Sequence, residues 1–279
     1  MLPPHRQDSL RAFEDYLRQC AARGPLAVAF SGGLDSRFVT YMALQAQIPV
    51  LALHAKGPHM AHSESHAACQ WAHEVGLTLH SFDFQPLALN GIRNNSPERC
   101  YICKQALIRG LHTALAALPG AQSWLLCDGT NADDLHAHRP GLRALREAGI
   151  CSPLAECGVS KAQIRLWAHT TGLAHPDQQA RPCLLTRLAY GMHPTAALLH
   201  RLAEAEAALA AAGLTDFRIR LRPAPLLQSR PLSAELRAQA QMLLHLHGFD
   251  GADMVEEEHI GGYFDRKGAK DTSSAQITR

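Results

Sequence analysis

Residues 26–40 read LAVAFSGGLDSRFVT. The apolar run Leu26–Phe30 ends in the turn Ser31–Ser36, and a helical pattern follows directly. A short apolar run bounded by glycines is typical of a buried parallel strand. Glycines permit a tight turn and a close approach of the backbone to a ligand. Because the next helix directs free N–H groups into this turn, the stretch predicts an anion-binding site.

The side chains of the turn suit a nucleotide. Ser31 and Ser36 add hydroxyl donors, Gly32 and Gly33 expose the backbone, and Asp35 offers a carboxylate for Mg²⁺ beside a phosphate. The spacing differs from the lysine-containing phosphate loop and from the dinucleotide fingerprint. It resembles the SGGxDS pyrophosphate loop of ATP pyrophosphatases, which implies cleavage of ATP to AMP and pyrophosphate. The alternative is an ordinary strand, turn and helix without a ligand.

Composition limits the class of protein. The chain has 279 residues, 47% of them hydrophobic, and a net charge of +2, which gives no basic footprint for nucleic acid. No apolar segment has the length of a signal peptide core or a membrane span. We therefore expect a cytoplasmic protein with neither membrane nor nucleic acid as a partner. Eight cysteines in such a chain are expected to be thiols, metal ligands or catalytic groups.

Strand and helix patterns alternate in the first half of the chain. Strands are expected at 26–30, 50–55, 77–84 and 123–127, with helices between them. This alternation predicts an α/β fold with a parallel sheet and helices on both faces. Ligands of such sheets bind beyond the carboxyl ends of the strands. We therefore expect Gly129, Thr130 and Asn131 to join the pyrophosphate loop in binding ATP; a turn that only satisfies its own backbone is the alternative.

The second half lacks this alternation. A helix capped by Ser160 is expected to end at Gly172, and two further helices and a strand follow. The sequence predicts three parts: residues 1–194 form the ATP pyrophosphatase domain, 195–265 a smaller α+β domain for sulfur transfer, and 266–279 a disordered tail.

Several cysteines and arginines are candidates for chemistry. Cys100 and Cys103 are three apart at a helix start and can chelate one metal or form a redox pair, although two structural thiols are an equal alternative. Cys183 has arginines on both sides in a loop, which favours a nucleophilic thiolate; a plain surface thiol is the commoner case.

In the stretch 218–222, strand alternation puts three arginines on one face, either as a phosphate clamp or as a solvated face. Histidines 62 and 66 are one helical turn apart, but a solvated helix explains them better than a nickel or zinc site.

Together these segments resemble one family, the LarE-type ATP-dependent sulfur transferases of nickel-pincer nucleotide cofactor synthesis. The resemblance extends from about residue 26 to 220. It rests on motifs that occur in a fixed order: SGGLDS (31–36), NSPERCYICK (95–104), DGTNADD (128–134), RPGLRA (139–144), SPL (152–154), SKAQIR (160–165), PCLLTR (182–187), YG (190–191) and FRIR (217–220).

The resemblance implies a substrate and a reaction. The substrate is a pyridinium mononucleotide with carboxylic acids, and its carboxylate attacks the α-phosphate of ATP to give an acyl-adenylate. A sulfur nucleophile then displaces AMP and leaves a thiocarboxylate. The family pattern makes Cys183 the sulfur carrier, with Asp35 as the second catalytic residue. It implies Arg187, Arg218 and Arg220 as ligands of the substrate phosphate, and a homo-oligomer.

The resemblance leaves two sulfur sources open. In members with one cysteine, the residue matching Cys183 gives up its own sulfur and ends as dehydroalanine. In another branch, three cysteines hold a [4Fe-4S] cluster. Because Cys100 and Cys103 are both present, we favour a cluster on these two residues and Cys183. Cys151 and Cys157 are spare ligands, whereas cysteines 20, 69 and 127 have the pattern of core residues.

The chain also departs from the family pattern. Gln178 and Gln179 replace the common Lys-Pro before the sulfur cysteine, Thr186 replaces a serine, and prolines 223 and 225 interrupt the segment after Arg220. Two other functions therefore stay open at this point. One is tRNA thiolation, which predicts a basic surface; the other is a nucleotide- or cluster-binding protein without catalysis.

Overall fold

The computed structural model describes residues 4–136, 140–258 and 260–264. The predicted tail at 266–279 and Arg139 of the RPGLRA motif lie outside these ranges. Contacts divide the chain into two compact units. The first contains Met1–Leu89 and Glu98–Arg181, and the second contains Asn90–Pro97 and Pro182–Arg279. None of the described helices has the length and apolar character that a membrane span requires.

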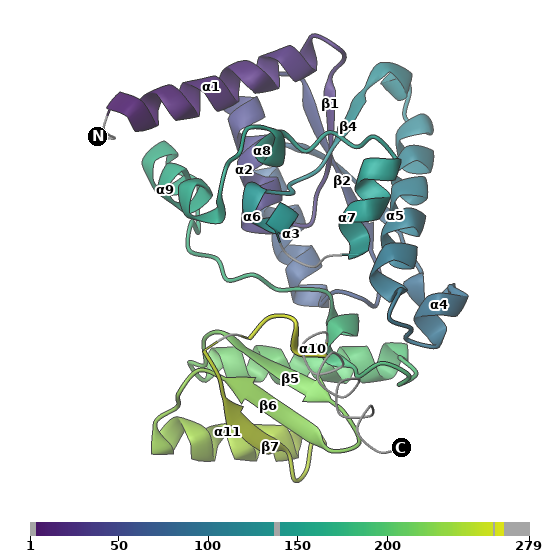
Figure 1. The fold of residues 1–279 in the computed structure, drawn as a ribbon, viewed down its shortest axis with the longest axis vertical. Helices are drawn as coiled ribbons and strands as arrows, with labels where there is room; N and C mark the ends of the chain where they lie inside the picture. The colour runs from purple at the N-terminus through teal and green to yellow at the C-terminus, as the bar shows by residue number, and fades with distance from the viewer. Residues whose placement is uncertain (1–3, 137–139, 259, 265–279) are drawn as a thin grey trace, which may run out of the picture. The chain divides into compact units, whose positions relative to one another are not determined.

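The first unit is built on a four-stranded parallel sheet, which confirms the predicted α/β class (Figure 1). The strand order is β3-β2-β1-β4, so the chain winds outward from β1 in both directions. The strands are β1 (Leu26–Ala29), β2 (Val50–Lys56), β3 (Thr78–Asp83) and β4 (Leu125–Cys127). Pairing Leu26 with both Val50 and Leu125 places β1 at the centre of the sheet.

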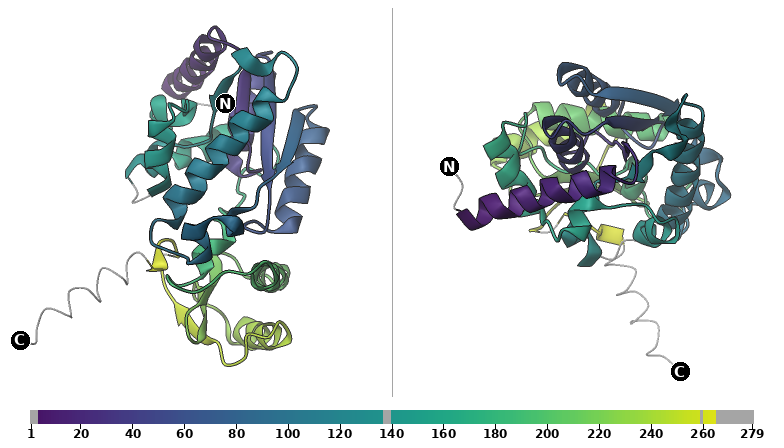
Figure 2. Two further views of the ribbon diagram at one scale, coloured as in Figure 1. Left: turned by 90° about the vertical axis from the view of Figure 1, so that its right-hand side faces the viewer. Right: turned by 90° about the horizontal axis from the view of Figure 1, so that it is seen from above.

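Helices cover both faces of this sheet. Figure 2 (left) looks onto the face that α5 covers. The α-helices of the unit are α1 (Pro4–Ala21), α2 (Leu34–Gln45), α3 (His62–Glu74), α5 (Arg99–Ala116), α6 (Ala132–His136), α7 (Pro140–Glu147), α8 (Pro153–Glu156) and α9 (Lys161–Thr171). Two short 3-10 helices complete it, η1 (Pro86–Ala88) and η2 (Ala121–Ser123).

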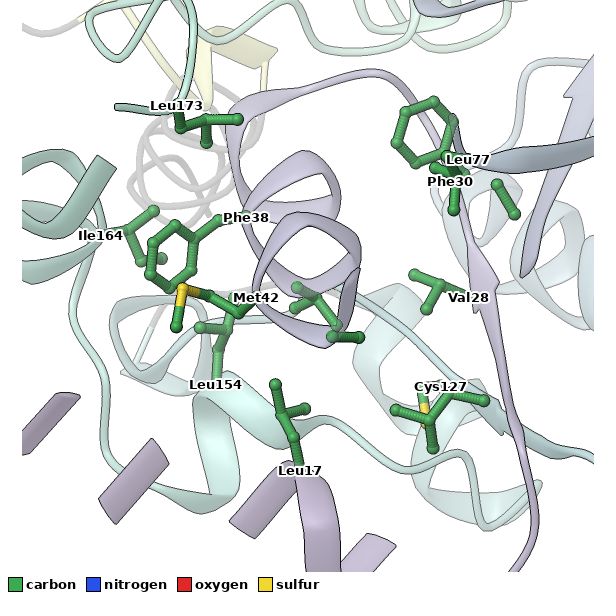
Figure 3. Close-up of a cluster of buried hydrophobic side chains, with 14 of the residues drawn as sticks. Leu17, Val28, Phe30, Phe38, Met42, Leu77, Cys127, Leu154, Ile164 and Leu173 are labelled. Carbon is green, nitrogen blue, oxygen red and sulfur yellow. The ribbon is translucent and has the colours of Figure 1, made fainter. Parts of the chain in front are cut away.

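Alternation along the strands separates two apolar cores. Leu26 and Val28 of β1 face the larger core, together with side chains of α1, α2, α3 and α9. Ala27, between them, faces the smaller core under α5. Figure 3 shows Phe38 and Met42 of α2 inside the larger core. Helix α2 is therefore buried along most of its length, and the loop before it rests on a rigid support.

The second unit has a small mixed sheet. Its order is β5-β6-β7, with β6 antiparallel to β5 and parallel to β7. Helices α10 and α11 lie together on one side of this sheet (Figure 2, left). The elements are α4 (Asn90–Arg93), the 3-10 helix η3 (Leu184–Arg187), α10 (Ala196–Ala211), β5 (Phe217–Leu221), β6 (Pro225–Ser229), α11 (Ala234–Leu246) and β7 (Asp253–Glu256).

The chain changes unit at Pro182, earlier than the expected position 194. The amide of Ala189 donates to the Leu221 carbonyl, which ties this segment to the end of β5. Nδ2 of Asn95 donates to the Ala189 carbonyl at 2.7 Å, and the Asn95 side chain is fully buried. These long-range bonds explain why 90–97 and the cysteine-bearing segment belong to the second unit.

Candidate functional site

The pyrophosphate loop connects β1 to α2. Ser31 Oγ lies 3.3 Å from Ser36 Oγ and accepts from the Gly33 amide at 3.3 Å. Gly32 has φ of +76°, and a Cβ there would lie 2.5 Å from the Ala68 Cβ. Only glycine fits this left-handed position against α3. The loop is thus closed by its own serines and pressed against a neighbouring helix.

The amino end of α2 has no side-chain cap. Gly33 is its N-cap residue and carries no side chain to bond the first amides of the helix. An uncapped helix start leaves N–H groups directed at the loop, and the helix dipole adds positive potential there. This backbone geometry suits an anion, and phosphate binding at the loop stays a prediction.

A second loop, Asp128–Asn131, lies against the first. A Cβ on Gly129 would lie 2.8 Å from the backbone N of Ser36, so the two loops are in direct backbone contact. Asn131 is 3% exposed, and its Nδ2 donates to Asp35 Oδ2 at 3.2 Å. The predicted nucleotide residues from both loops are brought together at the carboxyl ends of β1 and β4.

Asp128 supports its own loop. Its carboxylate accepts from the Thr130 amide and hydroxyl, at 3.1 and 2.6 Å. Ser152 Oγ donates to it as well, at 2.8 Å. The turn therefore satisfies its own backbone, as the alternative interpretation held, while Gly129 and Asn131 still face the pyrophosphate loop.

Lys161 is a site residue that the sequence reasoning missed. Its Nζ lies 2.5 Å from Asp35 Oδ1, and both side chains are about one quarter exposed (23% and 24%). The Lys161 amide donates to Asp133 at 2.8 Å, which fixes the start of α9 beside the loop. A lysine in the first turn of a helix opposes the helix dipole. A lysine at this unfavourable position, directly after the cap Ser160, is the feature of the sequence that could have indicated a role in the site.

A buried histidine connects the start of the pyrophosphate loop to α3. His54 is fully buried; its Nδ1 lies 2.8 Å from the Phe30 carbonyl and its Nε2 lies 2.7 Å from Ser65 Oγ. A carbonyl only accepts, so Nδ1 carries the proton and Nε2 accepts from the serine. Burial lowers the pKa of His54, since desolvation disfavours the charged ring. The histidine thereby holds the residue before Ser31 against α3.

Cys100 and Cys103 occupy the first turn of α5. Cys100 is exposed and Cys103 is partly exposed, and a separation of three residues puts both on the same side of the helix. Within each unit, the described residues include no group of three or more His, Cys, Asp or Glu side chains arranged to hold a metal. The first unit thus contains two of the three thiols that are expected to hold the cluster.

Cys183 lies in the second unit, immediately before η3. Its carbonyl accepts from the Thr186 hydroxyl at 2.7 Å and from the Thr186 amide at 3.0 Å. Arg187 is 2% exposed and donates to both carboxylate oxygens of Glu206 at 2.8 Å. It also donates to the Pro182 carbonyl at 3.1 Å. The turn that presents the cysteine is therefore fixed on both sides.

The other predicted phosphate ligands bond to the protein itself. Arg220 is 4% exposed, and its guanidinium donates to Gln228, to the Thr186 carbonyl and to the Ile260 carbonyl. Arg218 donates to the Phe217 carbonyl. Arginine 222 pairs with Asp253. Since these contacts organise the second unit, a role in binding substrate phosphate stays a prediction.

The remaining cysteines differ in burial. Cys20, Cys127 and Cys151 are buried in the larger core, with Sγ atoms of Cys20 and Cys151 3.7 Å apart. The bond to Cys151 and burial raise the pKa of Cys20. Burial raises the pKa of Cys157 to about 11. Cys69, expected in the core, is partly exposed on α3 because it lies at the edge of the helix face that packs on the sheet.

The parallel sheet, the SGGxDS loop and the second loop beside it define a class, the PP-loop ATP pyrophosphatases. Residues 10–106 match the family model described as asparagine synthase. The chain is 34% identical to the uncharacterized protein slr1717 of Synechocystis sp. over 69% of its length and 71% of that protein. It is 32% identical to the pyridinium-3,5-bisthiocarboxylic acid mononucleotide synthase of Lactiplantibacillus plantarum, over 70% of both chains. The chain belongs to the LarE family of ATP-using enzymes.

Proposed function

We propose that the protein is an ATP-dependent sulfur transferase that converts a carboxylate of a pyridinium carboxylic acid mononucleotide into a thiocarboxylate. The observation that carries this proposal is the contact of Asp35 with Lys161 and Asn131 beside the uncapped start of α2. This arrangement supplies hydrogen-bond donors from Asn131 and the α2 amides, the Lys161 cation and the Asp35 carboxylate where the leaving pyrophosphate of ATP would lie. The family supplies the substrate class, since the relative from Lactiplantibacillus plantarum is named for the bisthiocarboxylic acid product.

The first step is adenylation. A substrate carboxylate oxygen attacks the α-phosphorus of ATP, the bond between this phosphorus and the bridging oxygen breaks, and pyrophosphate leaves. Ser31, Ser36 and the first amides of α2 would bind the departing phosphates. Asp35 has the hard oxygen donors that Mg²⁺ prefers, and Mg²⁺ would offset charge on the phosphates. Lys161 adds a positive charge at the same place.

The second step transfers sulfur. A sulfur nucleophile attacks the acyl carbon, the carbon–oxygen bond to AMP breaks, and AMP leaves with the electron pair. We assign Cys100, Cys103 and Cys183 to a [4Fe-4S] cluster. Thiolates are its usual ligands, and the two cysteines of α5 are exposed enough to reach one cluster. When bound, the cluster would supply an iron without a protein ligand, where a sulfide can be held for transfer.

The two units would divide this work. The first unit holds the ATP loops, and the second holds the Cys183 turn with the buried arginines Arg187 and Arg220. Arg218 is partly exposed on β5 and completes the proposed set of substrate phosphate ligands. Together the three arginines would place positive charge near Cys183, the proposed sulfur carrier.

One experiment tests the proposal. Anaerobically prepared protein is incubated with Mg-ATP and a pyridinium dicarboxylic acid mononucleotide, and AMP, pyrophosphate and thiocarboxylate are measured separately. We expect AMP formation that depends on the mononucleotide, followed by thiocarboxylate. Asp35→Asn is the inactive control. ATP cleavage that depends on tRNA instead, or no cleavage at all, would show that the proposal is wrong.

A further inference from the structure

Helix α7 packs on the start of α5, the helix that carries Cys100 and Cys103 (Figure 1). Leu145 of α7 and Ile108 of α5 belong to one buried apolar cluster. Gly141 lies against the first turn of α5, since a Cβ there would be 3.5 Å from the Cys100 carbonyl oxygen. All of these residues belong to the first unit. The turn with the two thiols is therefore in contact with the RPGLRA segment, whose role the proposed function leaves open.

Arg143 of α7 contacts the side chain that stands between the two cysteines. Its guanidinium carbon lies over the Tyr101 ring, 3.7 Å from the ring centroid, in a cation–π contact. The same guanidinium pairs with Glu98 at 3.3 Å and with Glu147 at 3.6 Å. The Tyr101 hydroxyl donates to Glu147 at 2.6 Å and accepts from Gln105 at 2.6 Å. The ring is thus held on one face by the arginine and at its hydroxyl by two further side chains.

The start of α5 has little local stabilisation. Its N-cap residue is Glu98, whose side chain forms no capping hydrogen bond with the described amides of this helix. Arg99 stands in the first turn, where a cation opposes the helix dipole. The Ile102 amide donates to the Glu98 carbonyl at 3.0 Å and closes this turn. Because helix ends open at a free-energy cost near zero when tertiary contacts do not hold them, the contacts from α7 determine how often the turn is formed.

We propose that Arg143 is a positioning residue for Cys100 and Cys103: acting through Tyr101, it keeps the first turn of α5 folded with both thiols on one side. The inference rests on the proposed function only where it assigns these thiols to the cluster. Each ion pair of Arg143 is roughly half exposed and contributes little alone, but two pairs and the ring contact meet in one guanidinium. Since a metal needs both thiols at once, its apparent affinity falls with the fraction of chains in which the turn is folded.

The chain offers matched variants for a test. Arg143→Met removes the ring contact and both ion pairs but keeps a long side chain on α7. Arg146→Met makes the same change at an exposed arginine of the same helix and is the control. Tyr101→Leu removes the ring, whereas Tyr101→Phe keeps the ring under the guanidinium and loses only the hydroxyl. The double variant of Arg143→Met and Tyr101→Leu measures whether the two residues act together.

Two measurements are made on the reduced, metal-free full chain, without ATP or mononucleotide. Cd²⁺ is titrated, and the thiolate-to-metal charge-transfer absorption that Cys100→Ser abolishes gives the affinity of this pair. Hydrogen exchange of amides 102–104 reports the first turn. For Arg143→Met and Tyr101→Leu we expect faster exchange and about fivefold weaker Cd²⁺ binding, which is the cation–π contribution expressed as a ratio of constants. Tyr101→Phe and Arg146→Met are expected to stay within about twofold of the parent, and the double variant is expected to match Tyr101→Leu.

Equal Cd²⁺ affinities of Arg143→Met and Arg146→Met would overturn the inference. A further fivefold loss when Arg143→Met is added to Tyr101→Leu would also overturn it, because the arginine would then act independently of the ring. Weaker Cd²⁺ binding with unchanged exchange of the first turn would do the same. If the variants behave as expected but the parent holds no iron and forms no thiocarboxylate, the role of Arg143 is supported and the proposed function is contradicted.

Discussion

Lys161 Nζ lies 2.5 Å from Asp35 Oδ1, although the two residues are 126 positions apart in the chain. Asn131 donates to the other oxygen of the same carboxylate. Asp35 therefore holds together the pyrophosphate loop, the loop after β4 and the start of α9. The lysine beside this carboxylate can balance the negative charge of an incoming phosphate, whereas Mg²⁺ would have to displace the lysine from Asp35.

Replacing Lys161 by Met is expected to slow mononucleotide-dependent pyrophosphate release by about tenfold or more, since charge-assisted bonds contribute roughly 1.5–3 kcal/mol. The rate is measured at saturating Mg-ATP and again across ATP concentrations. Lys56→Met removes an exposed lysine elsewhere in the first unit and serves as the control. Equal rates in the two variants would show that Lys161 has no role in pyrophosphate release.

Gly129→Ala tests the contact between the two loops. The added Cβ would lie 2.8 Å from the Ser36 backbone nitrogen, so one loop must shift. Overpacking of this kind costs about 1–3 kcal/mol, and we expect about tenfold weaker ATP binding by calorimetry. Gly141→Ala is the control, because its nearest neighbour would be at 3.5 Å, an ordinary contact. Unchanged ATP affinity in Gly129→Ala would show that the loops do not act together.

The pyrophosphate loop was predictable because its signals are local. Glycines at 32 and 33 with serines at 31 and 36 dictate a turn and its donors within six residues. The α9 helix was predicted for the same reason: Ser160 and Gln163 form the capping box, and Gly172 ends the helix in the left-handed conformation. The nearness of Lys161 to Asp35 was not predictable, because it depends on how α9 packs against α2.

The second unit was harder to predict. Strand β6 begins at Pro225, which was interpreted as an interruption; in the structure this proline stands at the strand's first residue, where a proline is tolerated. Strand β7 is mostly exposed and acidic, so it lacks the apolar alternation that identifies strands. The arginines at 218 and 220 were predicted to share a face, but only Arg220 is buried, and it is held by Gln228 and Ile260, contacts which no local pattern reveals.

The cysteine assignment predicts the iron content. Cys100→Ser and Cys103→Ser are each expected to lose most of the iron and labile sulfide of the anaerobically reconstituted protein, because a cluster held by three thiolates does not survive the loss of one. Cys69→Ser, also partly exposed, is the control. If both α5 variants transfer sulfur as well as the parent, and mass spectrometry finds that Cys183 has lost the elements of H₂S, the cysteine itself is the sulfur source.

The pair of Arg187 and Glu206 predicts a stability effect. The arginine is 2% exposed and the glutamate side chain is 15% exposed, so Glu206→Gln leaves a buried positive charge without its counter-ion. We expect a loss of about 3 kcal/mol in the free energy of unfolding, measured by urea titration. Arg230→Met, which breaks the exposed pair with Asp216, is expected to cost less than about 1 kcal/mol. A small effect of Glu206→Gln would favour a guanidinium that is available to the substrate phosphate.

His59 predicts how stability depends on pH. Burial, followed by the charges of His54 and Lys104, lowers the pKa of His59 from 6.5 to about 4. His59 is therefore protonated near pH 6.5 in the unfolded chain but only near pH 4 in the folded protein. The histidine's share of stability is complete above pH 6.5 and is lost as the pH falls toward 4. Its removal in His59→Gln should reduce the fall in the free energy of unfolding between pH 7 and 4.5 by roughly 2 kcal/mol. His66→Gln, at an exposed position of α3, should leave the fall unchanged. Identical pH profiles for parent and His59→Gln would mean that this ring is protonated in the folded protein as readily as in the unfolded chain.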